Sequence, residues 1–123
     1  MVKTFAVIFG LVFLVVGILG FVPAAAPDGM LLNTFHVNTA HNIVHLALGI
    51  FFPFVAMGGA RASRIWFQIF GVIYAVVAIW GFGVGTGNTL WVISNNPADT
   101  WLHVVLAVVM LFLGFGTAKQ TAF

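Results

Sequence analysis

Four long apolar runs constrain this chain more than any other feature of its sequence. Each run is close to the length of about 20 residues that an α-helix needs to cross the hydrocarbon of a bilayer, and only 5% of the residues are charged. We therefore expect an all-α integral membrane protein, a bundle of four transmembrane helices that forms one domain over 1–123. The expected spans are Thr4 to Val22, Ile43 to Met57, Ile65 to Phe82 and Trp101 to Gly116.

The charged residues predict how these helices are oriented. All four cations fall on one side of the expected membrane, and both acids fall on the other. Because cytoplasmic connections are enriched in Lys and Arg, both termini are expected in the cytoplasm. The net charge of +2 provides no basic surface for phosphates, so nucleic acid is not an expected partner. The cations are Lys3, Arg61, Arg64 and Lys119, and the acids are Asp28 and Asp99.

The two halves of the sequence resemble each other. The segment IFGLV at 8–12 recurs as IFGVI at 69–73, an offset of 61 residues, and the segment 38–46 aligns with 96–104 at an offset of 58 residues. Two helices per repeat give both copies the same orientation in the membrane. We expect two tandem, parallel αα-hairpin repeats, over 1–60 and 61–123.

The stretch HVNTAHNIVHLALGIFFPF, residues 36–54, places three of the four histidines around the start of the second span. Asparagine is a favoured helix N-cap, so Asn38 and Asn96 explain part of the polar content. Capping does not explain His45 or its repeat counterpart His103, each of which lies about 10 Å along the helix axis from its cap. These two histidines are therefore the candidate cofactor-binding residues.

Several kinds of chemistry fit these residues. His41 and His45 share a helix face, and Asp99 and His103 repeat their spacing of four. Three imidazoles and a carboxylate suit zinc or iron, so His41, His45, Asp99 and His103 form a candidate metal site. Alternatively, His45 and His103 are axial ligands of a tetrapyrrole, haem or chlorophyll, between the helices. The remaining hypotheses are that these side chains only bond one another, or that they relay protons or ions.

The motifs VNTAHNIVHL at 37–46 and WLH at 101–103 are similar to those of the small bacterial membrane proteins called domain of unknown function 4383. His41, Asn42, His45 and His103 match that pattern. The resemblance implies a four-helix integral membrane protein of bacteria, in the inner membrane or, in cyanobacteria, in the thylakoid membrane. The resemblance implies no particular biochemical activity.

The sequence predicts a scaffold or accessory subunit rather than an enzyme, and we identify no catalytic residues in it. Such a subunit packs against other membrane proteins, in a larger complex or as a homo-oligomer within the lipid bilayer, and holds a metal or tetrapyrrole through histidines near the outer face. The alternative is a proton- or ion-conducting channel or transporter that uses the same histidines as a relay. An enzyme would need a bound metal with an open coordination position.

Overall fold

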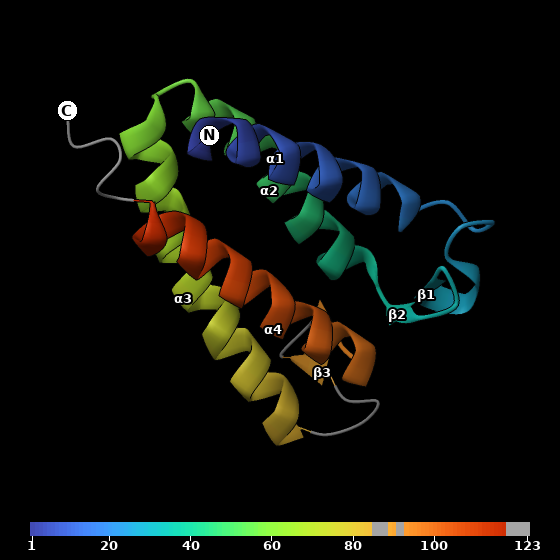
Figure 1. Ribbon diagram of the computed structural model, residues 1–123. Coiled ribbons are helices and arrows are strands. Elements are labelled where there is room, and N and C mark those ends of the chain that lie inside the picture. The colour runs from blue at the N-terminus through green and yellow to red at the C-terminus, as the bar shows by residue number, and fades with distance from the viewer. Residues whose placement is uncertain (85–88, 91–92, 118–123) are drawn as a thin grey trace.

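The computed structural model describes residues 1–84, 89–90 and 93–117, and it is mostly helical (Figure 1). In this part of the chain, four helices are long and apolar enough to cross a membrane. The expected multi-pass membrane protein is confirmed to that extent. The helices are α1 (Val2–Leu19), α2 (Thr39–Ala56), α3 (Ala60–Val84) and α4 (Pro97–Leu111), which a π-helical turn, η2 (Phe112–Gly116), extends.

Two of the helices begin at the asparagine caps that the sequence predicts. The Asn38 Oδ1 atom accepts a hydrogen bond from the backbone N–H of His41 at 2.9 Å. The Asn96 Oδ1 atom accepts one from the N–H of Asp99 at 2.9 Å, and the Asp99 carboxylate accepts the N–H of Asn96 in return, which completes a capping box. Because α2 starts before His41, the second apolar run reaches spanning length, and His41 lies in its first turn.

The helices pack as two pairs, α1 with α2 and α3 with α4. Glycines allow the close approach within each pair. A Cβ atom added at Gly10 would lie 2.3 Å from the ring of Pro53, and one added at Gly71 would lie 2.8 Å from the side chain of Leu111. In lipid, where apolar burial does not drive association, this close van der Waals contact helps to hold helices together.

Two short β-hairpins, which the sequence analysis did not predict, lie at one end of the bundle. They form within the connections between α1 and α2 and between α3 and α4. We call this end the β end, and the opposite end, where α2 connects to α3, the turn end. A 3₁₀ turn, η1 (Pro27–Gly29), precedes β1 (Met30–Leu31), which pairs antiparallel with β2 (Phe35–His36), and β3 (Thr89–Leu90) pairs antiparallel with β4 (Ile93–Ser94).

The two helix pairs lie closest together near the turn end and diverge toward the β end (Figure 1). Aromatic side chains fill the core between the pairs. Phe9 of α1 packs edge-on against Phe67 of α3 with ring centres 5.1 Å apart, and within the first pair Phe13 stacks on Phe52 at 5.7 Å. Together with the fully buried Met110, these rings fill the interior of the bundle on the side of the turn end.

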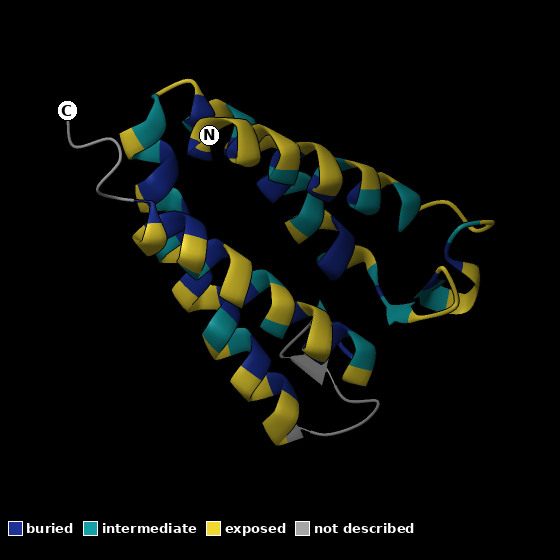
Figure 2. Cartoon of the chain, viewed as in Figure 1, coloured by how far each residue is buried: buried dark blue, intermediate teal, exposed yellow. Residues whose placement is uncertain are grey.

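The outer faces of the helices are apolar and exposed, whereas buried residues gather on the inner faces (Figure 2). No more than 39% of any spanning window is buried inside the described chain. A helix of a water-soluble protein normally places polar residues on its exposed face. The exposed apolar faces therefore suit contact with lipid or with other membrane-embedded surfaces.

Candidate functional site

Two cavities of about 280 and 240 Å³ lie between the helix pairs in the described part of the structure. The first lies mainly between α1 and α4 and is covered by the connection that carries β1 and β2. The second lies mainly between α2 and α3. Four side chains line both cavities, and we call them the central wall: His41, His45, Tyr74 and His103.

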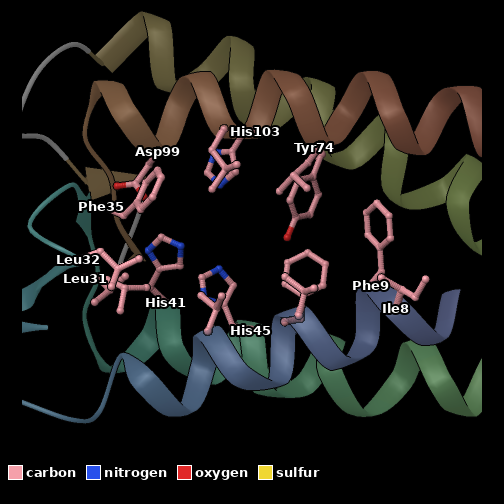
Figure 3. A pocket seen from close by; sticks show the side chains of 16 residues that line it. Ile8, Phe9, Leu31, Leu32, Phe35, His41, His45, Tyr74, Asp99 and His103 are labelled. Carbon is pink, nitrogen blue, oxygen red and sulfur yellow. The ribbon is translucent and has the colours of Figure 1, made fainter. Parts of the chain in front are cut away.

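The central wall is built from both helix pairs. Figure 3 shows His41 and His45, from α2, facing His103 and Tyr74 across the space between the pairs. The remaining lining is almost entirely apolar. The first cavity is lined by aliphatic and aromatic residues of α1 and α4, and the second by apolar residues of α2 and α3 that include Phe70 and Trp80.

The three imidazoles of the central wall lie close together. The ring centres of His41 and His45 are 4.5 Å apart, and those of His41 and His103, which belong to different helix pairs, are 6.4 Å apart. His41 is only 4% exposed and His103 is 8% exposed. The repeat predicts that His45 faces His103, but the ring that contacts His103 across the interface is that of His41, one helical turn away.

The Nδ1 atoms of His41, His45 and His103 are all buried, and none has a hydrogen-bond partner among the described residues. The hypothesis that these histidines only bond one another therefore has no support at these nitrogens. Leaving a buried polar atom without a partner costs about 1–3 kcal/mol. Such atoms are uncommon in folded proteins, and each one calls for an explanation.

Aromatic rings hold the imidazoles in place. The ring of Tyr74 packs perpendicular to that of His103, with centres 5.5 Å apart and an interplanar angle of 88°. Phe13 lies 5.7 Å from His45 and 6.1 Å from Tyr74. Figure 3 shows the Tyr74 hydroxyl pointing into the space between the pairs. The sequence analysis missed Tyr74, although it is the only tyrosine of the chain and lies in the middle of a span.

Asp99 accepts backbone hydrogen bonds from two segments of the chain. Its Oδ2 atom accepts the backbone N–H of His36 at 3.1 Å and that of Asn96 at 3.0 Å. The Asn96 side-chain amide also donates to the Thr34 carbonyl at 3.0 Å. These bonds attach the β1–β2 connection to the start of α4. Asp99 thus lines the β end of the first cavity while its carboxylate is engaged with backbone donors.

The metal site predicted from His41, His45, Asp99 and His103 stays a prediction. Across the residues described, no group of three or more His, Cys, Asp or Glu side chains is placed to hold a metal ion. Asp99 lies in the first turn of α4, where its Oδ2 atom caps the helix and binds the neighbouring connection. The three histidines remain together as a separate group.

The model of a family described as Domain of unknown function (DUF4383) matches residues 3–116. The chain belongs to this family. The match covers all four spanning helices and every residue of the central wall, so the resemblance noted from the histidine motifs is confirmed. Comparisons with curated proteins and with solved structures returned no match.

Proposed function

We propose that this protein is a small membrane accessory protein that holds a ligand between its two helix pairs, in contact with His41, His45 and His103. The observation that carries the proposal is the set of three buried Nδ1 atoms without partners in the described structure. They converge from both pairs on the wall between two apolar cavities. Small-molecule sites typically combine apolar walls with a few placed polar groups, and ionisable residues at membrane depth commonly mark function.

A transition metal and a tetrapyrrole are the ligand classes whose chemistry uses imidazole in this way. Zinc or iron accepts neutral imidazole nitrogens. Two imidazoles that share a tetrahedral ion have ring centres about 5 Å apart, given metal–nitrogen bonds of about 2 Å. The distances of 4.5 and 6.4 Å from His41 to its two neighbours bracket that value. A bare ion shared by these imidazoles would thus require their rings to rotate.

The accessory role is supported by the surface of the helices. Large apolar side chains along all four spans are exposed, and they form broad faces without a partner within the described chain, including Ile50, Phe54, Ile79, Trp101 and Val108. A protein of this size buries little of that surface itself. We propose that part of it contacts other membrane subunits or a second copy, in the bacterial inner membrane or the thylakoid membrane.

We also propose that the fold arose from two tandem αα-hairpin repeats. Positions that the repeat equates make equivalent close contacts: a Cβ atom at Gly20 would meet the Asn42 side chain, and one at Gly81 would meet the Thr100 side chain. Each repeat also carries a β-hairpin between its two helices. Equal contacts at equated positions are what a duplicated hairpin would retain.

The charges support an orientation with both termini in the cytoplasm. Lys3, Arg61 and Arg64 all belong to the turn end, whereas Asp28 and Asp99 belong to the β end. Cytoplasmic connections are enriched in Lys and Arg. The fourth cation, Lys119, lies outside the described residues. In this orientation the central wall lies in the outer half of the membrane.

A proton or ion relay through the same histidines has less support. Between the central wall and the turn end, the core contains Phe52, Phe67 and Met110, each of which is fully buried. A conducting path needs polar groups or water along its length. The apolar core in this half of the described structure favours ligand holding over transport.

The test is purification of the protein from its native membrane in a mild detergent. Absorption spectra, elemental analysis and mass spectrometry of an organic extract should show one ligand in a ratio near one per chain. The variant in which His41, His45 and His103 are all replaced by alanine should lose it. His36→Ala is the matched control, because the contact of His36 with Asp99 uses only its backbone.

Retention of the same ligand by the triple variant would contradict the proposal. So would a native preparation that contains neither metal nor organic ligand above background. Far-ultraviolet circular dichroism and a single gel-filtration peak would show that each variant is folded, so that loss of ligand is not confused with loss of structure.

A further inference from the structure

We propose that the ligand is an iron tetrapyrrole of the haem class, lying in the plane between the helix pairs with His41 and His103 as its two axial ligands. This inference rests on the proposed function and names the ligand of the same site. It differs from the pairing of His45 with His103 that the sequence repeat predicts.

The separation of the two imidazoles carries the inference. An iron atom lies about 2 Å from each axial nitrogen, and that nitrogen lies about 1 Å from the centre of its ring, so the ring centres of an axial pair are about 6 Å apart. The His41 and His103 ring centres are 6.4 Å apart. His41 comes from α2 and His103 from α4, so the two rings approach the space between the helix pairs from opposite sides.

The two cavities provide room for the ring on both sides of this axis. A planar ring between His41 and His103 extends toward α1 and α4 on one side, into the first cavity, and toward α2 and α3 on the other, into the second. Small-molecule sites usually have volumes of about 300–1,000 Å³. Neither cavity reaches this range alone, at about 280 and 240 Å³, but a ligand that occupies both does.

The lining of the cavities suits a large apolar ring. Phe9 and Phe13 line the first cavity, and Phe70 and Trp80 line the second. Histidines apart, Asp99 is the one charged residue in the described lining, and its Oδ2 atom is already engaged by two backbone N–H groups. Aromatic side chains offer flat surfaces that pack favourably against a conjugated ring.

A tetrapyrrole needs fewer ligands from the protein than a bare ion does. The macrocycle itself provides four nitrogen ligands to the iron, so the protein has to provide only two. His41 and His103, whose ring centres have the separation of an axial pair, are the two ligands in this proposal. His45 and Tyr74 then act as positioning residues, because their rings lie 4.5 Å from that of His41 and 5.5 Å from that of His103.

The test is a titration of haemin into the full-length protein, purified in detergent and freed of any native ligand. Wild-type protein should give the sharp absorption bands and the electron paramagnetic resonance signal of low-spin, six-coordinate iron. His41→Ala and His103→Ala should each give high-spin iron and bind haemin at least about tenfold more weakly. Added imidazole should restore the low-spin spectrum in both variants.

Three further variants sharpen the assignment. His36→Ala should behave as wild type, and His45→Ala should stay low-spin, because its imidazole is not an axial ligand in this arrangement. His103→Met replaces one imidazole with one thioether. It should shift the spectrum to that of mixed histidine and methionine ligation. This last variant keeps the site occupied by a side chain of similar length, so a folding defect is not the cause of its change.

Several outcomes would overturn the inference. One is a low-spin spectrum that persists in both His41→Ala and His103→Ala. Another is a spectrum of haemin with the wild-type protein that does not differ from the spectrum of haemin in empty micelles. A magnesium chlorin in the native protein in place of iron would also overturn it. If the native protein instead carries zinc or iron without a tetrapyrrole, and the triple histidine variant loses that metal, this inference fails while the proposed function stands.

Discussion

Replacement of Gly10 by alanine should separate α1 from α2 and destabilise the protein. The added Cβ would lie 2.3 Å from the Cδ atom of Pro53 and 2.5 Å from its Cγ atom. Carbon atoms in contact normally lie about 3.5–4.0 Å apart, so the helices would have to move apart by roughly 1 Å at this point. The proline ring is tied to its own backbone and cannot rotate out of the way.

The magnitude follows from two opposing effects. Forcing an extra methyl group into a packed contact costs about 1–3 kcal/mol. Alanine gains about 0.5–1 kcal/mol over glycine within a helix, because glycine loses more backbone freedom on folding. The expected net loss is therefore about 1–2 kcal/mol in the free energy of unfolding, or roughly a 5- to 30-fold change in the folding equilibrium.

The assay is reversible unfolding in mixed micelles, followed by circular dichroism. Gly83→Ala is the matched control, because Gly83 also lies in a spanning helix and its added Cβ would meet nothing within 4 Å. This control should be as stable as wild type or slightly more stable. The reasoning would be refuted if Gly10→Ala left the unfolding free energy unchanged, or if Gly83→Ala lowered it by the same amount.

Asp99→Ala should cost about 3–6 kcal/mol and expose the β1–β2 connection to limited proteolysis, since hydrogen bonds to a charged group contribute about 1.5–3 kcal/mol each and this carboxylate accepts two. A variant with wild-type stability and cleavage would argue against the attachment. Tyr74→Phe should change stability by less than about 0.5 kcal/mol, whereas Tyr74→Ala should cost about 3–5 kcal/mol, because the buried ring provides the packing. Equal unfolding midpoints for the two Tyr74 variants would count against that role. Proteoliposomes that contain the protein should conduct protons no faster than empty vesicles; flux that His45→Ala or His103→Ala abolishes would favour the relay.

The central wall shows why the histidines are better understood through the structure than through their spacing. His41 and His45 are four residues apart, which places them on one helix face whatever the fold. That spacing does not determine which imidazole from the other helix pair comes close. The pairs diverge toward the β end and leave space between them. Across this space, the ring of His41 lies 6.4 Å from the ring of His103.

Local composition and short motifs were enough to predict several features of this protein. Apolar length predicted four spanning helices, and Asn38 and Asn96 predicted where α2 and α4 begin, because a cap is a contact between residues only three apart. The family also followed from short motifs around His41, His45 and His103. These features need no knowledge of how one helix lies against another.

Contacts between distant segments could be read from the packed structure alone. The structure placed Tyr74 beside His103, and it placed the Asp99 carboxylate where it accepts the N–H of His36, 63 residues away. A carboxylate in the first turn of a helix has strong local donors, and they compete with any metal ligand set. Such competition is settled by which segments meet in space, and spacing along the chain does not contain that information.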